Sequence, residues 1–203
     1  MTQRKPKIVG IGGTTRADSS SERALRFALE VAAHLGADTL AFSGADLALD
    51  PYDPARPERS EAAQQLVAAL RHADGILVAT PSYHGSISGL VKNALDYVED
   101  LREDARPYLE DRAVGCIVCA QGTQSIGLTL VALRSVVHAL RGWPTPYAAH
   151  VDVSARPFGP SGLEATPQVA ERLRLVASQV MEFALMQRLY RQARAGATRA
   201  EAG

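Results

Sequence analysis

Short apolar runs alternate along this chain with longer segments in which apolar residues recur every three or four positions. The continuous apolar runs lie at residues 8–11, 75–79 and 113–120. The segments with helical spacing lie at residues 20–35, 60–73, 90–98, 126–140 and 167–189. Strands that read as unbroken apolar runs are typical of a parallel sheet that helices cover on both faces. The pattern therefore predicts an α/β fold built on a parallel sheet.

Two weaker strands complete the predicted five-stranded sheet. One is expected at residues 39–42 and the other between residues 145 and 153. Residues 43–59 carry several prolines and charges, and we expect them to form a long surface loop. No repeat or linker interrupts the pattern, so residues 1–191 are expected to form one domain. Residues 192–203 lack an apolar stripe and are expected to be a flexible C-terminal tail.

The first apolar run leads into a loop of small, hydroxyl-bearing and basic residues: Gly12, Gly13, Thr14, Arg16, Ser19 and Ser21. Glycines let a ligand approach the backbone closely, hydroxyls donate hydrogen bonds, and the arginine adds a fixed positive charge. The N-terminus of the following helix would point unpaired N–H groups at the same place. Ser19 to Glu22 also fits a capping box, so Ser19 has a purely structural interpretation as well. The loop is a candidate phosphate site.

Three predicted strands end in polar loops, at residues 12–21, 80–89 and 121–125. The carboxyl ends of parallel strands meet at one edge of the sheet, where ligands bind at the switch point of strand order. A P-loop is excluded because no lysine follows the glycines. Thr15 stands where a dinucleotide fingerprint has its third glycine, and no acidic residue ends the second strand at Phe42. A mononucleotide fits these loops best.

The charge balance narrows the choice of partner. The chain has 22 basic and 22 acidic residues, so it carries no basic field that would hold nucleic acid or an anionic membrane. No apolar run approaches the roughly 18 residues of a membrane helix. We therefore expect a soluble, cytoplasmic protein with small-molecule substrates, and neither nucleic acid nor membrane as a partner.

Cysteine and histidine usage gives no sign of a disulfide or a metal site. Cys116 and Cys119 are spaced as C-x-x-C, but they lie within a predicted strand, where residues three apart point to opposite faces. The five histidines are scattered without the spacing of metal ligands. We expect no metal.

Two stretches resemble the NADPH-dependent FMN reductase family. The loop that begins at Gly13 is similar to the family's phosphate loop, G-S-x-R-x-x-S-x-N. The segment from Thr80 to Asp96, TPSYHGSISGLVKNALD, is similar to its signature T-P-x-Y-N-G-S-x-x-G-x-L-K-N-A-x-D. The resemblance covers about residues 7–142 and implies a flavodoxin-like three-layer sandwich with a five-stranded parallel sheet. FMN would bind at the carboxyl ends of the strands.

Carried over residue by residue, the resemblance implies three groups of cofactor-binding residues. The FMN phosphate would be held by Thr14, Arg16, Ser19 and Ser21. The isoalloxazine would be bordered by Pro81, Ser82, Tyr83, His84, Gly85 and Ser86, and closed on its other side by Gln121, Gly122 and Thr123. Thr14, Ser21 and His84 depart from the family's usual serine, asparagine and asparagine. FMN would carry the chemistry, so no catalytic side chain is expected.

Several of these residues have a second interpretation. Tyr83 is either a border of the flavin or a packed aromatic residue with a solvated hydroxyl. Lys92 and Asp96 either form part of a site or form an exposed ion pair, and we favour the ion pair. Arg56 and Arg59 in the long loop either meet the 2′-phosphate of NADPH or are solvated. Trp143 contacts either a partner or the core.

The resemblance implies a flavoprotein oxidoreductase. Hydride would pass from NADPH or NADH through FMN to a flavin or another small acceptor. A quinone, azo-compound or metal-ion reductase on the same scaffold is one alternative, and a flavodoxin-like electron carrier is another. Carriers tend to be acidic, so the neutral charge favours the enzyme. A homodimer or homotetramer is expected, and supply of reduced flavin to a monooxygenase is a further expectation.

Overall fold

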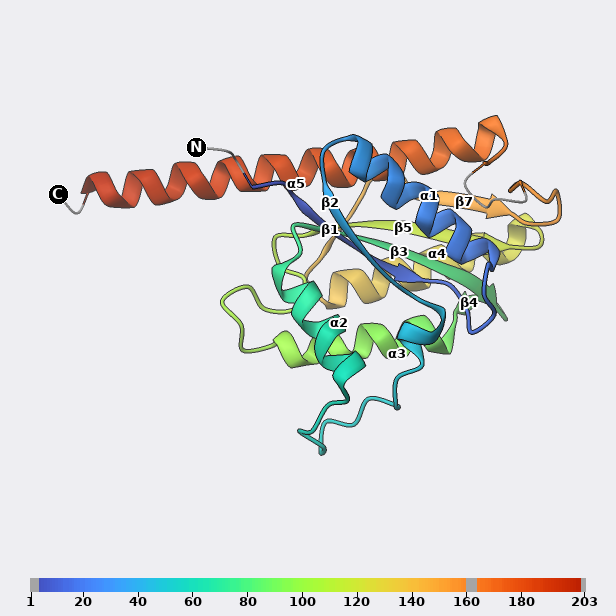
Figure 1. Ribbon diagram of the computed structural model, residues 1–203, viewed down its shortest axis with the longest axis horizontal. Helices are drawn as coiled ribbons and strands as arrows, with labels where there is room; N and C mark the ends of the chain where they lie inside the picture. Colours follow the sequence, from blue (N-terminus) through green and yellow to red (C-terminus); the bar gives the residue numbers. More distant parts are fainter. Residues whose placement is uncertain (1–3, 160–163, 202–203) are drawn as a thin grey trace.

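The computed structural model describes residues 4–159 and 164–201, apart from the side chains of Thr123 and of residues 195–201. Strands and helices alternate along most of the chain (Figure 1). The strands are β1 (Lys7–Gly12), β2 (Asp38–Ser43), β3 (Gly75–Tyr83), β4 (Ser86–Ile87), β5 (Ala113–Ala120), β6 (Trp143–Pro144) and β7 (Ala149–Asp152). The helices are α1 (Ser20–His34), α2 (Glu61–His72), α3 (Gly89–Asp96), α4 (Thr123–Ala139) and α5 (Pro167–Glu201), with 3₁₀ turns η1 (Gly44–Leu47) and η2 (Tyr97–Leu101).

The main sheet is parallel and follows the order β2-β1-β3-β5-β6. The fifth position is shared, because β6 pairs with the beginning of β5 and β7 pairs with its end. Strand order reverses between β1 and β3, which places the switch point of the sheet there. This is the predicted flavodoxin-like arrangement, in which a ligand crevice opens beyond the ends of β1 and β3.

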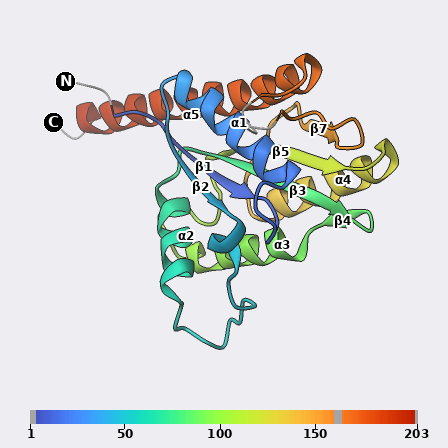
Figure 2. The ribbon, with the colours of Figure 1, turned by 45° about the vertical axis from the view of Figure 1, so that its right-hand side comes forward.

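Helices cover both faces of the sheet (Figures 1 and 2). On one face, α1 and α5 bury Leu25 and Val176 against Ile8 and Ile117. On the other, α2, α3 and α4 bury a second apolar layer that includes Leu70, Leu95 and Leu133. The central strands are apolar toward both layers, which explains their unbroken apolar runs.

Three boundaries differ from the sequence prediction. Strand β3 runs on through residues 80–83, which were expected to be loop, and turns back as β4 in an antiparallel hairpin. The two turn residues, His84 and Gly85, have φ angles of 54° and 80°, the signs that a type I′ hairpin requires. Helix α4 begins at Thr123, inside the predicted loop 121–125. The pair Trp143–Pro144 forms a strand that the sequence pattern did not indicate.

Helix α5 also continues well beyond its predicted end near residue 189. It extends to Glu201 although its last part lacks the apolar periodicity that marks a helix packed on a core. The expected flexibility of residues 192–203 remains a prediction, and residues 202–203 lie outside the described part of the chain.

The long loop at residues 43–59 is fastened to the body through helix α3. The amide of Asn93 accepts a hydrogen bond from Tyr52 N (2.8 Å) and donates to Asp50 O (2.9 Å) and Leu49 O (3.3 Å). Tyr97 adds a bond from its hydroxyl to Asp50 O (2.9 Å). The KNALD part of the family signature therefore has a structural role here, and Lys92 forms the expected exposed ion pair with Asp96.

Over the described residues, no helix is long and apolar enough to cross a membrane.

Candidate functional site

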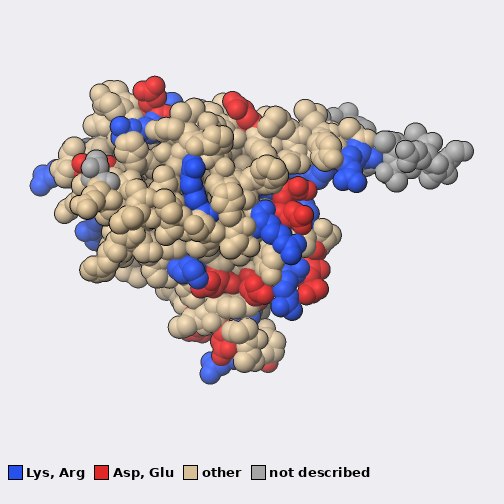
Figure 3. All heavy atoms as spheres, turned by 180° about the vertical axis from the view of Figure 1, so that it is seen from behind, with Lys and Arg blue, Asp and Glu red and all other residues tan. Residues whose placement is uncertain are grey.

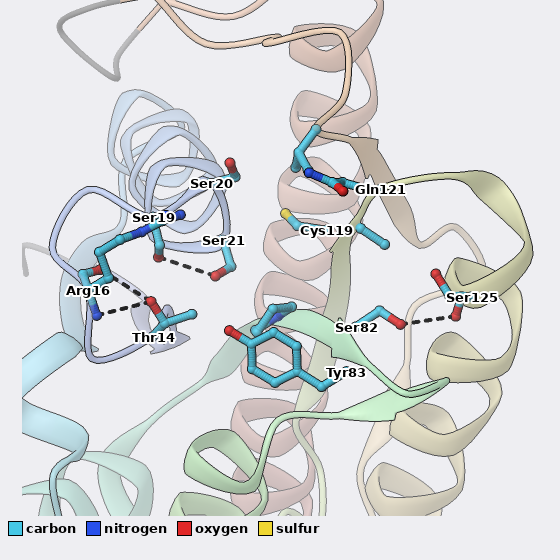
Figure 4. Close-up of a pocket in the computed structure, with 13 residues that line it drawn as sticks. Thr14, Arg16, Ser19, Ser20, Ser21, Ser82, Tyr83, Cys119, Gln121 and Ser125 are labelled. Carbon is cyan, nitrogen blue, oxygen red and sulfur yellow. Dashed lines mark hydrogen bonds between the residues drawn. The ribbon is translucent and has the colours of Figure 1, made fainter.

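A cavity of about 340 Å³ lies at the carboxyl ends of β1, β3 and β5, beside the switch point of the sheet (Figure 4). It is lined by Thr14, Arg16, Ser19, Ser20, Ser21, Pro81, Ser82, Tyr83, Cys119, Ala120, Gln121, Ser125 and Val153. All three predicted loops contribute to this one cavity. No Asp or Glu is among these lining residues, and Arg16 supplies their one formal charge.

The turn after β1 brings the first loop to the cavity. Gly12 packs so closely on β3 that an added Cβ would lie 2.4 Å from Ala79 O, and Gly13 adopts a φ of 97° while its N–H donates to Ala79 O (3.3 Å). Both features favour glycine. Thr14 Oγ1 then closes a local turn by accepting from Arg16 N (3.1 Å).

The first turn of α1 contributes two buried hydroxyls. Ser19 is the N-cap and accepts from Glu22 N (3.3 Å), so its predicted capping role is confirmed. Ser21 Oγ lies 3.4 Å from Ser19 Oγ, and both residues are 2 % exposed. Figure 4 shows these hydroxyls and the Arg16 side chain around the same end of the cavity. Hydroxyl groups, a helix N-terminus and a guanidinium form a donor set that suits a phosphate.

The second loop forms the opposite wall through the β3–β4 hairpin. Ser82 Oγ lies 2.7 Å from Thr129 Oγ1 and donates to Ser125 O at 3.3 Å, which ties the hairpin to α4. Thr80 Oγ1 accepts from Ser88 N (3.1 Å), and Ser88 caps α3. These bonds fix Pro81 and Ser82 at the cavity wall on regular strand structure rather than on a free loop.

Tyr83 sits at the mouth of the cavity with 53 % of its surface exposed (Figure 4). It is the one aromatic residue among those that line the cavity. The walls are otherwise built from small and hydroxyl-bearing side chains, so a planar ligand has room beside the phosphate-binding end.

The structure gathers eight of the predicted cofactor-binding residues around the cavity: Thr14, Arg16, Ser19, Ser21, Pro81, Ser82, Tyr83 and Gln121. The others do not line it. His84, Gly85 and Ser86 lie in and after the hairpin turn, Gly122 is the N-cap of α4, and the side chain of Thr123 is outside the described part. Their predicted contacts with a flavin therefore stay predictions.

Sequence reasoning missed five lining residues: Ser20, Cys119, Ala120, Ser125 and Val153. Ser125 could have been predicted, because it is a polar residue in a loop that follows a predicted strand. Cys119 and Ala120 were not predicted because they belong to the continuous apolar run of β5, and nothing in that run indicates that its last residues line a cavity.

The two cysteines point to opposite layers of the core, as predicted. Cys116 packs in the layer of α2, α3 and α4, and Cys119 in the layer of α1 and α5. Burial raises the pKa of each thiol to about 12. Cys119 therefore presents a neutral thiol to the cavity rather than a thiolate.

Arg59, one of the two arginines of the long loop, is held in an ion pair and is not available to bind a nucleotide. Arg59 is bound by both carboxylate oxygens of Asp100 (2.7 and 2.9 Å) and lies over the Tyr52 ring. Hydrogen bonding to Arg59 holds the pKa of Asp100 below its usual value. Arg56 is solvated and lies 3.6 Å from Asp53. Neither arginine lines the cavity.

Comparison with known proteins agrees with this geometry. The sequence profile of the family described as NADPH-dependent FMN reductase matches residues 6–155. The chain is 34 % identical over 113 residues to an FMN-dependent NADPH-azoreductase of Staphylococcus aureus, and 35 % identical over 114 residues to that of Staphylococcus haemolyticus. These alignments cover 55 % of this chain and 56 % of each relative, so the chain spans just over half the length of the curated relatives it matches.

Solved structures share the fold at low sequence identity. The flavoenzyme NAD(P)H:(acceptor) oxidoreductase FerB of Paracoccus denitrificans aligns with a TM-score of 0.73 at 18 % identity, covering 90 % of this chain and 98 % of that one. An apo NADH:FMN oxidoreductase aligns with a TM-score of 0.66 at 21 % identity, covering 90 % of both chains. A flavodoxin, WrbA-like protein of Agrobacterium tumefaciens aligns at 0.63 and 19 %, covering 90 % of this chain and 99 % of that one.

The profile match covers most of the chain and includes the phosphate loop and the hairpin that build the cavity. The chain therefore belongs to the NADPH-dependent FMN reductase family.

Proposed function

We propose that the protein is an FMN-dependent NAD(P)H reductase that passes hydride equivalents to a small acceptor. The observation that carries the proposal is the single cavity that joins the phosphate loop of β1 to the hairpin of β3. FMN, when bound there, supplies the acceptance and donation of hydride. The tasks left to this chain are to bind the cofactor, orient it and keep one face of its ring accessible.

The donor set divides these tasks between the two ends of the cavity. Arg16, Ser19 and Ser21 would hold the phosphate, because they offer a positive charge and hydroxyl groups with no carboxylate among the lining residues. The hairpin from Pro81 to Tyr83, fixed by the Ser82–Thr129 contact, would set the position of the ring. Nothing in this arrangement requires a side chain to give or take a proton.

The acceptor is a small molecule in this proposal. A free flavin, a quinone and an azo compound all have a planar electron-accepting group that can lie against a flavin ring. We also propose a cytoplasmic location, a homodimer or homotetramer, and delivery of reduced flavin to a monooxygenase as one use of the product. The azoreductase activity named for the staphylococcal relatives supports testing azo compounds first.

An electron carrier is the second candidate, because flavodoxin-like proteins of both kinds share this fold. Two observations disfavour it. The chain is neutral, and Tyr83 is the one aromatic residue among the residues that line the cavity, so a flavin ring bound there would not be enclosed between two aromatic side chains.

Anaerobic stopped-flow spectroscopy separates the two. The FMN-loaded protein is mixed with NADPH or NADH and followed at the flavin absorption band, and then with FMN, a quinone or an azo dye. The enzyme predicts bleaching within seconds by one nucleotide and recovery of the colour with an acceptor. No bleaching with either nucleotide, while dithionite reduces the flavin normally, would establish the carrier instead.

A further inference from the structure

A second cavity adjoins the phosphate-binding end of the candidate FMN site. This adjoining cavity has a volume of about 230 Å³ and lies between the first turn of α1 and the segment that follows β7. Its lining residues are Asp18, Ser20, Arg23, Val153, Arg156, Pro157 and Phe158. Ser20 and Val153 line both cavities, so the two share a wall. Figure 4 shows Ser20 beside Ser19 and Ser21, the two hydroxyls of the candidate phosphate site.

Two arginines give the adjoining cavity a positive charge. Arg156 is exposed, and its guanidinium makes no hydrogen bond or ion pair with any residue that the structure describes. Arg23 is held in place, because its Nε donates to Asp18 O (2.9 Å) and its Nη1 to Gly159 O (3.0 Å). Both acceptors are backbone carbonyls. These bonds therefore fix the Arg23 guanidinium without cancelling its charge.

Asp18 is the one acidic residue among those that line the adjoining cavity, and it already has a partner. Its carboxylate forms an ion pair with Arg26 at 2.5 Å. The hydrogen bond from Arg26 holds the pKa of Asp18 below its usual value, so the group stays ionised and paired. The charges of Arg23 and Arg156 are therefore left for an anionic ligand.

The chain as a whole has no general attraction for anions. Its basic and acidic residues are equal in number. On the face that Figure 3 shows, Lys and Arg side chains are interspersed with Asp and Glu rather than gathered into a broad basic surface. An anion would therefore be drawn to the adjoining cavity by the arginines that line it, and not by the field of the whole molecule.

The size and lining of the adjoining cavity favour one part of a larger ligand. Cavities that hold a whole small molecule usually measure about 300–1,000 Å³, and this one is smaller. Because it begins where the FMN phosphate would lie, its occupant is expected to be joined to that phosphate. Ser20 offers a hydroxyl at the junction. Val153, Pro157 and Phe158 add apolar and aromatic surface that suits a sugar and a base.

We propose that the adjoining cavity holds the adenosine monophosphate half of FAD, so that the protein binds FAD as well as FMN. FAD is FMN whose phosphate is joined to adenosine monophosphate. Its first phosphate would lie in the loop after β1, and its second would pair with Arg23 and Arg156. The ribose and adenine would lie against Val153 and Phe158. This inference rests on the proposed function, because it takes the position of the flavin phosphate from it.

NADPH is the other nucleotide whose phosphates could use this chemistry. For hydride transfer its nicotinamide must lie against the flavin ring. The residues proposed to set the position of that ring belong to the β3–β4 hairpin, on the wall opposite the phosphate loop. The adjoining cavity begins at the phosphate loop itself, so a group attached to the flavin phosphate reaches it directly. This position favours FAD over NADPH.

Calorimetric titration of the apoprotein with FMN and with FAD tests the assignment. The unmodified chain should bind FAD within about 10-fold of its affinity for FMN. Arg156→Ala should weaken FAD binding about 10-fold and change FMN binding less than about twofold, since it removes a hydrogen-bonding charge from the adjoining cavity alone. Arg156→Glu should weaken FAD binding further, through repulsion of the phosphate. Arg56→Ala is the matched control, because it removes a solvated arginine that lines neither cavity.

The FMN titration separates this inference from the proposed function and shows that each variant is folded. FAD binding that is more than about 10-fold weaker than FMN binding in the unmodified chain would overturn the inference. Equal effects of Arg156→Ala on both flavins, or no effect on either, would also overturn it, and in each case FMN binding by the unmodified chain leaves the proposed function standing. A raised KM for NADPH in Arg156→Ala, with unchanged FAD binding, would assign the adjoining cavity to NADPH instead. Failure of the unmodified chain to bind FMN would contradict the proposed function itself.

Discussion

Ser82 Oγ lies 2.7 Å from Thr129 Oγ1, and this contact joins the hairpin of the candidate site to the first turns of α4. Thr129 is fully buried, so its hydroxyl has little access to another partner. The contact links two segments that are far apart in sequence and together form one wall of the cavity.

Removing that link should loosen the hairpin. Thr129→Val keeps the shape of the side chain and removes the hydroxyl, at a cost of about 1 kcal/mol in the free energy of unfolding. We expect FMN affinity to fall several-fold as well, measured by fluorescence titration. Ser135→Ala is the control, because Ser135 on the same helix bonds to Val131 O (2.9 Å) at the surface. Equal FMN affinity in the two variants would show that the hairpin is held by other contacts.

Asn93 should protect the long loop from proteolysis. Asn93→Ala removes three bonds to the backbone of residues 49–52, so the loop should open more often and trypsin should cut sooner after Arg59, the loop arginine that is not followed by proline. The expected loss of stability is about 1–3 kcal/mol. Lys92→Ala removes an exposed ion pair on the same helix and should cost no more than about 0.5 kcal/mol. Mass spectrometry of the first fragments distinguishes the two variants, and an identical rate of cleavage after Arg59 in both would exclude this role for Asn93.

The Arg59–Asp100 pair should stabilise the protein in a pH-dependent way. The pKa of Asp100 is lower in the folded protein than in the unfolded chain, where it is about 3.9. Its contribution is therefore present above about pH 4 and is lost as pH falls through the lowered pKa.

Asp100→Asn should lower the free energy of unfolding by about 1–2 kcal/mol at pH 7, since it weakens a two-bond ion pair that is mostly shielded from water. The difference between the variant and the unmodified chain should shrink at pH 3. Urea denaturation at both pH values measures it, and a difference that grows toward acid would contradict the assignment.

The fold was predictable because each main strand and helix carries its own periodicity. The failures have physical causes. The strand predicted at β3 ended too early, at Ala79. The hairpin turn after β3 places His84 at positive φ, and in the sequence only the following glycine indicates a turn. Strand β6 is two residues long and contains a proline, so no pattern marks it. Helix α5 was predicted to end near residue 189 because residues 191–201 contain no large apolar residue that would mark a continuing helix face.

The candidate site was likewise predictable only where the signal is local in the sequence. Side chains that precede or begin a helix, such as Ser19, could be placed from local spacing. Residues such as Val153 line the cavity because β7 lies beside β5, and local sequence does not reveal that neighbour.

Cys119 should be unreactive although it lines the cavity. With a thiol pKa of about 12, it is almost entirely protonated at pH 7.5, and Cys116 is equally so. Ellman's reagent should therefore react slowly with the folded protein and promptly with two thiols per chain after denaturation. One fast-reacting thiol in the folded state would show that Cys119 is ionised or exposed.

In the proposed function, the loop after β1 holds the phosphate of FMN through Arg16. The direct test is calorimetric titration of Arg16→Ala with FMN and with riboflavin, which lacks the phosphate. The loss for FMN should be about 1.5–3 kcal/mol, roughly 10- to 150-fold in affinity, with little change for riboflavin. Arg56→Ala, which removes a solvated arginine outside the cavity, should bind both ligands as the unmodified chain does. Equal losses of FMN and riboflavin, or no loss of either, would contradict the placement of the phosphate at this loop.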